Sequence, residues 1–181
     1  MAFGIYDAAD FGAPQNRVRL LLAPPVLIRR LNETPACERV SMAQGLHAAG
    51  VAVPQGATHV KNSSWSNGSA NVRPLTAPAF TCCASRALTF CTATGRTVLS
   101  MRPEHTRALM GLLGFKLSGV QRVDQRVLGN GMCAGFTRAI CSAAMGENLP
   151  ECESMETRLL CLERRLTAVE TKLDRRSTHP L

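Results

Sequence analysis

The sequence of 181 residues is poor in aromatic residues and has no long apolar run. Aromatic residues make up only 4% of the chain, so Leu, Val, Ala and Met must supply most of any core. The longest apolar runs, 20–25 and 139–145, are far too short to span a bilayer, which excludes a membrane span. The N-terminus also lacks the basic and apolar regions of a secretory signal. We therefore expect an intracellular protein, with nothing to choose between nucleus and cytoplasm.

The sequence also lacks the residue spacings of common metal sites and catalytic centres. It has eight cysteines but no Cys-x-x-C, and no Cys/His group has zinc-finger spacing, so we expect no metal site. Without a secretion signal, these thiols are expected to be reduced, small apolar residues. The four histidines are scattered, and no Ser/His/Asp set, carboxylate pair or P-loop occurs. A stand-alone enzyme of those classes is therefore not indicated.

Composition and charge favour a globular protein with a polyanionic partner. Hydrophobic residues make up 45% and charged residues 19%, which is typical of a folded domain. The net charge is +8, and among the 21 basic residues only Lys61, Lys116 and Lys172 are lysines. Arginine suits bidentate recognition of phosphates and bases, so double-stranded DNA is a candidate partner. The alternative is a biased nucleotide composition, because most arginine codons are rich in G and C. The basic residues are also spread along the chain, which argues against one dense basic patch.

Periodicity and turn residues predict a mixture of short strands and helices. In the first part of the chain we expect a strand at 18–23, helices at 27–31 and 40–49, and a loop over 51–72. Short β segments are expected at 81, 88–92 and 97–99. A helix then runs from a Ser100 cap to about Leu113, where Gly114 ends it, and a further helix at 132–145 is ended by Gly146.

Residues 153–176 carry an apolar stripe at heptad spacing. Its members are Met155, Leu159, Leu162, Leu166, Val169 and Leu173. The spacing predicts an amphipathic helix. Two interpretations remain open: a helix that packs on its own domain, and a short coiled coil that joins two copies of the chain into a homodimer.

Residues 10–20 form the most distinctive segment, a turn followed by Gln-x-Arg-x-Arg that runs into an apolar strand. Because alternate residues of a strand point the same way, Gln15, Arg17 and Arg19 are expected to line one face. Three such donors could hold a base edge and a phosphate. The alternative is a solvated edge strand whose charges discourage aggregation.

This segment resembles the Gly-x-Pro-Gln-x-Arg-x-Arg motif, the eighth of ten, of DNA cytosine-5 methyltransferases. Residues 75–81 and 98–111 resemble the ninth motif, a Pro-x-x-Thr strand before a helix. Residues 124–140 resemble the tenth, a Gln-x-x-Gly-Asn turn that leads into an amphipathic helix. The three segments follow the order of the family, and the resemblance extends from residue 7 to about 145.

The motifs that perform the family's chemistry are absent. The nucleophilic cysteine lies in a Pro-Cys-Gln loop in the family, and this chain has no Pro-Cys dipeptide. The Gly-rich turn that holds S-adenosylmethionine is also missing. Glu147-Asn148-Leu149 is close to the family's Glu-Asn-Val, but it follows the tenth-motif segment instead of preceding the eighth. The resemblance therefore implies a C-terminal part that is inactive without an N-terminal methyltransferase half.

Within the family, the matched residues have defined roles. Gln15, Arg17 and Arg19 match donors of the pocket for the flipped cytosine, with Arg19 closest to the base. Gly129 and Asn130 match the turn that closes over S-adenosylmethionine, which would bind only together with the missing half.

The implied fold class is α+β, as a C-terminal fragment of an α/β S-adenosylmethionine-dependent methyltransferase. Its expected parts are a catalytic-sheet remnant (1–23), a small domain in the place of the target-recognition region (24–99), helices that return to the catalytic domain (100–150), and an amphipathic helix with a tail (151–181). Without the rest of that sheet, strand 18–23 is expected to have an unpaired apolar edge. Two other functions stay open: a non-catalytic DNA-binding or regulatory module that self-associates through 153–176, and a non-functional fragment.

Overall fold

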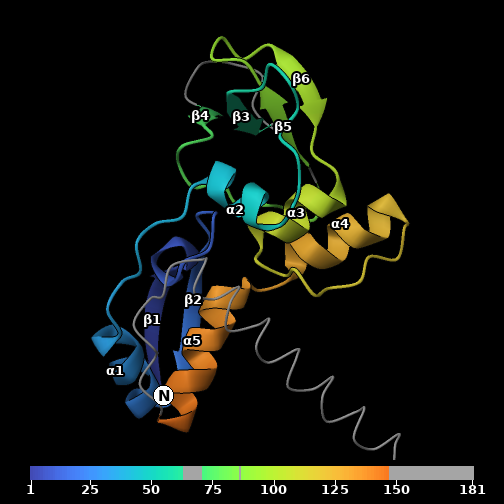
Figure 1. Cartoon of the computed structure of the whole chain (residues 1–181). Coiled ribbons are helices and arrows are strands. Elements are labelled where there is room, and N and C mark those ends of the chain that lie inside the picture. The colour runs from blue at the N-terminus through green and yellow to red at the C-terminus, as the bar shows by residue number, and fades with distance from the viewer. Residues whose placement is uncertain (63–70, 86, 147–181) are drawn as a thin grey trace, which may run out of the picture. The chain divides into compact units, whose positions relative to one another are not determined.

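The computed structural model describes residues 1–62, 71–85 and 87–146, which form a small α+β fold with two antiparallel sheets (Figure 1). The expected α+β class is therefore confirmed. The expected amphipathic helix at 153–176 and the segment 147–149 lie outside the described residues. None of the described helices is long and apolar enough to cross a bilayer.

The first sheet consists of β1 (Ala2–Asp7) and β2 (Val18–Ala23), joined through the 3-10 helix η1 (Ala8–Phe11). Strand β2 has the bounds that the sequence predicts. Its register places Phe3 opposite Leu22 and Ile5 opposite Leu20. The expectation that β2 lacks a neighbouring strand is therefore wrong for one of its two edges, because β1 forms the backbone hydrogen bonds there. Strand β1 was not predicted from the sequence, since Ala2, Gly4 and Asp7 weaken the strand pattern.

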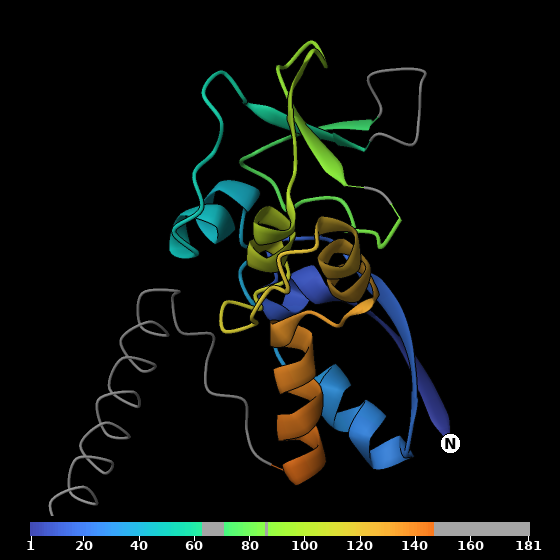
Figure 2. The same cartoon turned by 90° about the vertical axis from the view of Figure 1, so that its right-hand side faces the viewer.

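Helices α1 (Pro25–Glu33) and α5 (Ala134–Met145) lie beside this sheet and close the first core (Figures 1 and 2). Both were expected from the sequence at nearly these positions. Three of the few aromatic rings pack together here: the ring centroid of Phe136 is 5.1 Å from that of Phe11 and 5.7 Å from that of Tyr6. Helix α5 can approach η1 this closely because a Cβ on Gly135 would lie 2.2 Å from the Phe11 carbonyl oxygen.

The second sheet has the strand order β4-β3-β5-β6. Its strands are β3 (His59–Asn62), β4 (Val72–Pro74), β5 (Leu88–Cys91) and β6 (Thr97–Ser100). All four residues of β5 are buried, and the sheet forms a second core with helices α2 (Met42–Ala48) and α3 (Pro103–Leu109). The β segments at 88–92 and 97–99 and the helix at 40–49 are confirmed. The loop expected over 51–72 is wrong where β3 and β4 begin.

Two helical predictions are corrected after residue 100. Helix α3 is capped at Arg102 rather than Ser100, and it ends at Leu109, before the left-handed turn at Gly111. Helix α4 (Gln121–Asn130) was not predicted, because its polar sequence was interpreted as a turn. The Asp124 carboxylate stabilises its first turn by accepting hydrogen bonds from the backbone N–H and hydroxyl of Ser118 and from the N–H of Gly119. These bonds, the one from the Ser118 N–H above all, lower the pKa of Asp124.

Candidate functional site

Gln15 lies at the point where the three segments that resemble methyltransferase motifs meet. Its amide nitrogen donates to the carbonyl of Leu109, at the end of α3, over 3.1 Å. Its amide oxygen accepts the backbone N–H of Cys82 at 2.9 Å. The side chain is completely buried, so both of its polar atoms are used inside the protein.

Arg17 makes the second connection between these segments. Its guanidinium donates to the carbonyl of Cys82 and to the carbonyl of Gly129, each over 2.7 Å. Only 2% of the residue is exposed, and its Nε has no hydrogen-bond partner. Burial lowers the pKa of Arg17, and the nearby Arg19 adds to the effect. Arg17 therefore joins the eighth-motif segment to both α4 and the loop before β5.

Arg19 is placed differently from its two predicted companions. It is exposed on β2, and its guanidinium donates to the carbonyl of the neighbouring Val18. The expectation that Gln15, Arg17 and Arg19 line one open face is thus wrong. Strand β2 begins only at Val18, so Gln15 and Arg17 precede it and turn inward. Of the three, only Arg19 remains available to a ligand.

Gly129 and Asn130 form the last two positions of α4 and not a turn, which corrects the expectation from the tenth-motif resemblance. A Cβ on Gly129 would lie 2.1 Å from the backbone nitrogen of Ala84. Gly129 therefore allows α4 to touch the loop at Ala84. Asn130 is exposed.

The side chains of Gln125 and Thr106 also take part in this junction, in contacts that the sequence did not predict. Gln125 of α4 donates to the carbonyl of Cys83, and its own carbonyl oxygen accepts the hydroxyl of Thr106 of α3. The loop at 82–84 is thus held from three directions. Amide and hydroxyl side chains of this kind give no specific sequence signal, because they are equally common on exposed helix faces.

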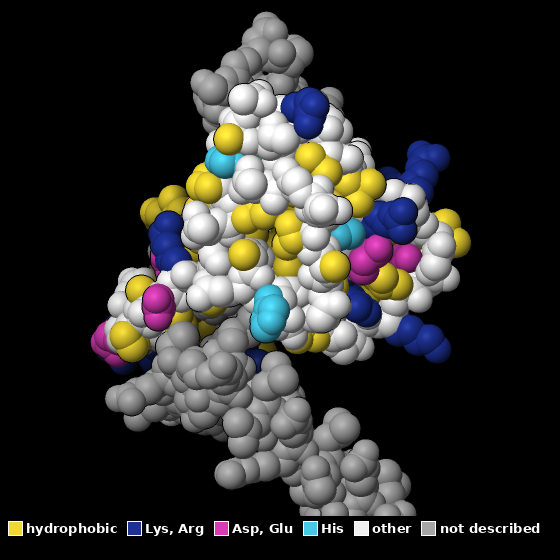
Figure 3. All heavy atoms as spheres, turned by 45° about the horizontal axis from the view of Figure 1, so that its top comes forward, with side chains coloured by type: hydrophobic (Ala, Val, Ile, Leu, Met, Phe, Trp, Pro, Cys, Tyr) yellow, Lys and Arg dark blue, Asp and Glu magenta, His cyan; other side chains and the backbone are white. Residues whose placement is uncertain are grey.

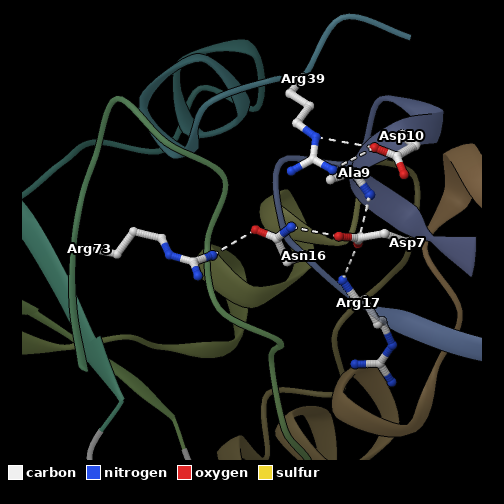
Figure 4. Close-up of polar contacts among 7 residues, drawn as sticks. All are labelled: Asp7, Ala9, Asp10, Asn16, Arg17, Arg39 and Arg73. Atoms are coloured by element: carbon white, nitrogen blue, oxygen red, sulfur yellow. Dashed lines mark hydrogen bonds and ion pairs between the residues drawn. The ribbon is translucent and has the colours of Figure 1, made fainter. Parts of the chain in front are cut away.

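Asp7 anchors the entry into the eighth-motif segment (Figure 4). Its carboxylate accepts hydrogen bonds from the backbone N–H of Arg17 at 2.7 Å, the side chain of Asn16 at 2.6 Å and the N–H of Ala9 at 3.2 Å. Asn16 in turn accepts from the guanidinium of Arg73 at 2.6 Å. Burial alone would raise the pKa of Asp7, but the three hydrogen bonds together lower it below the usual 3.8.

We expect this carboxylate to make stability depend on pH. The unfolded chain binds the proton more readily than the folded protein, so the contribution of Asp7 is complete above the unfolded pKa. It is lost as the pH falls through the lower folded pKa. The urea midpoint should therefore fall between about pH 5 and pH 3, and less steeply in Asp7→Asn. Asp10→Asn makes the same charge change in an exposed ion pair with Arg39 and should keep the wild-type slope. Equal slopes in wild type and Asp7→Asn would contradict the role of Asp7.

Two buried thiols at this junction, those of Cys82 and Cys133, are poorly suited to act as nucleophiles. Burial raises the pKa of Cys82 to about 12 and that of Cys133 to about 11. A thiolate is the reactive form, so both remain protonated near neutral pH. Among the described residues, no group of His, Cys, Asp and Glu side chains could hold a metal ion.

Comparison with known protein families, with curated proteins and with solved structures finds no match to this chain.

Proposed function

We propose that this chain is the C-terminal half of a DNA cytosine-5 methyltransferase, which contributes DNA recognition and the pocket for a flipped cytosine. It is inactive until an N-terminal half supplies the nucleophile and the methyl donor. In this proposal Arg19 contacts the DNA, while Gln15 and Arg17 hold the pocket from behind.

The observation that supports the proposal is the convergence of the three motif-like segments. Residues of the eighth-motif segment bond directly to the end of α3, to the loop at 82–84 and to the end of α4. These contacts join positions that are 65 to 112 residues apart in the chain. Segments that resemble successive motifs of one enzyme family thus form one site. A chance resemblance would not require this.

The described residues do not by themselves form a site for S-adenosylmethionine. The space beside Gly129 is filled by the backbone of Cys83 and Ala84, and the Gly129 carbonyl is bonded to Arg17. Only Asn130 stays exposed among the two positions matched to the cofactor turn. In the proposed function, the methyl donor is therefore held mainly by the other half.

A non-catalytic DNA-binding module is the second candidate, and the lack of a Pro-Cys dipeptide favours it for the chain alone. Both candidates require binding to duplex DNA. Figure 3 shows Lys and Arg side chains at several separate places on one face, with acidic side chains among them, rather than in one dense patch. Binding should therefore depend on individual arginines, and the two candidates differ only in methyl transfer.

We expect the chain to bind duplex DNA with an affinity that falls steeply as salt rises. Arg19→Ala should weaken this binding by about fivefold or more, the usual loss for an arginine that contacts a base or a phosphate. Fluorescence anisotropy with a labelled duplex measures both effects. Arg29→Ala is the matched control, because this exposed arginine of α1 forms only a surface ion pair with Glu33. Equal binding by wild type and Arg19→Ala would contradict the role of Arg19.

A methyl-transfer assay tests the catalytic part of the proposal. Labelled S-adenosylmethionine and unmethylated duplex DNA are mixed with the chain alone, and with the chain plus a co-expressed half that carries the Pro-Cys-Gln loop. Transfer only in the mixture, and its loss in Arg19→Ala, would support a split methyltransferase. Transfer by the chain alone would contradict it. DNA binding without transfer in either sample would favour the non-catalytic module, and absence of both would favour a non-functional fragment.

A further inference from the structure

The two faces of the β1–β2 sheet differ sharply in their surroundings. The inward face, with Tyr6 and Ala23, belongs to the first core under α1 and α5. The opposite face carries five large apolar side chains that remain exposed. They are Phe3 (68% exposed), Ile5 (68%), Val18 (55%), Leu20 (61%) and Leu22 (63%). We call this set the outer face.

The outer face is comparable in area to the largest apolar patch found on a typical monomer. If a large apolar side chain carries roughly 150 to 200 Å², these five expose on the order of 500 Å². The largest apolar patch of a monomer is often a functional surface. Asp7 occupies the remaining position of β1 on this side, and its carboxylate is bonded to Arg17 and Asn16. The outer face thus includes no basic side chain, so its chemistry suits an apolar surface better than DNA or an acidic peptide.

We propose that the outer face binds the outer face of a second copy of this chain, forming a symmetric dimer. In the register of the sheet, Phe3–Leu22 and Ile5–Leu20 are adjacent cross-strand pairs. A two-fold axis that passes between these two pairs places Phe3–Leu22 of one copy over Ile5–Leu20 of the other copy, and the reverse. Apolar side chains of the two copies therefore contact each other. Two such faces bury on the order of 1,000 Å² in total, about the minimum for a specific interface.

No described helix covers the outer face, so the rest of the fold is compatible with this dimer. Helices α1 and α5 pack on the opposite side of the sheet, so two copies would form a four-layer stack of helices, sheet, sheet and helices. Arg19 alternates with Val18 and Leu20 along β2 and points away from the outer face. Each copy in the dimer would thus keep its exposed arginine, and the dimer is proposed for the chain without a second half.

Sedimentation velocity of the nuclease-treated full chain at high salt tests the dimer, over concentrations from micromolar to several hundred micromolar. We expect a monomer–dimer equilibrium for the wild type. Leu20→Glu and, independently, Ile5→Glu should weaken self-association by at least about tenfold, because each buries a charge in the interface. Both positions are exposed in the single chain, so the variants should retain the wild-type circular dichroism. Val123→Glu places the same charge on a half-exposed valine of α4 and should dimerise like the wild type.

The double variant Leu162→Asp/Leu166→Asp separates the outer face from the heptad stripe at 153–176. Dimerisation that survives in this variant and is lost in Leu20→Glu would support the outer face. A wild type that stays monomeric at the highest concentration would overturn the proposal and leave the face to a different polypeptide. Dimerisation that Leu20→Glu leaves intact would overturn it as well, as would dimerisation lost only in the double variant.

Discussion

Arg17→Ala should lower the free energy of unfolding by about 3 kcal/mol, because it leaves two buried carbonyls unpaired and opens a cavity. The carbonyls of Cys82 and Gly129 each receive a 2.7 Å hydrogen bond from this guanidinium, and both residues are buried. We expect this loss of stability to be smaller than the loss on breaking a buried ion pair. The reason is that Arg17→Ala also removes a positive charge whose burial is unfavourable. Urea denaturation followed by circular dichroism measures the change.

Two variants control this experiment. Arg19→Ala removes an exposed arginine two residues away, so its stability should stay within about 0.5 kcal/mol of the wild type. Arg17→Met restores most of the side-chain volume without the hydrogen bonds, and we expect a loss between those of the other two variants. If Arg17→Met were as stable as the wild type, volume alone would explain the role of Arg17. If Arg17→Ala were neutral, the junction would not depend on Arg17 at all.

Gly129→Ala should lower the free energy of unfolding by about 2 kcal/mol, although alanine favours helices by about 1 kcal/mol over glycine. The added Cβ would lie 2.1 Å from the nitrogen of Ala84 and 2.4 Å from the carbonyl carbon of Cys83. Both are backbone atoms of a loop that Gln15, Arg17 and Gln125 hold in place. The loop cannot move aside without breaking these bonds. The overlap therefore outweighs the gain in helix propensity.

Gly114→Ala is the matched control for this substitution. A Cβ at Gly114 would meet no atom within 4 Å, and its backbone is outside the left-handed region. Its stability should be unchanged or higher by up to about 1 kcal/mol, because alanine restricts the unfolded chain. Thermal or urea unfolding of both variants gives the comparison. A Gly129→Ala protein at least as stable as Gly114→Ala would show that α4 and the loop are not in close contact.

The sequence predicted those elements whose apolar pattern and end signals agree. Strand β2 is bounded by Pro24, and α5 ends at Gly146 with a φ of 74°, so both were placed correctly. Helix α4 was missed because only Leu128 of its apolar residues is fully buried, and Val123 and Val127 are exposed. Its stability comes from the hydrogen bonds between Asp124 and the preceding residues Ser118 and Gly119, and from contacts with α3.

The sequence predicted which residues belong to the site, but not which way the side chains of Gln15 and Arg17 point. The alternation rule applies only inside a strand, and Gln15 and Arg17 lie before β2. Their orientation is decided by carbonyls of distant segments, at Leu109, Cys82 and Gly129. A single sequence does not show which unpaired carbonyls the fold will bring to a polar side chain. The partners of Arg17 could therefore be found only from the structure, whereas its importance could be expected from the motif.

The pairing of the N-terminal sheet with α5 has a consequence for synthesis of the chain on the ribosome. Strand β2 ends at Ala23, but the helix that covers its inner side is complete only at Met145. At typical translation rates this interval lasts roughly 6 to 25 s. During that time only α1 is present to cover the inner side of the sheet, so a strand rich in leucine is more open to other chains or to chaperones. Slower translation would lengthen this exposure, and the yield of soluble protein should depend on it more than the stability of the finished fold suggests.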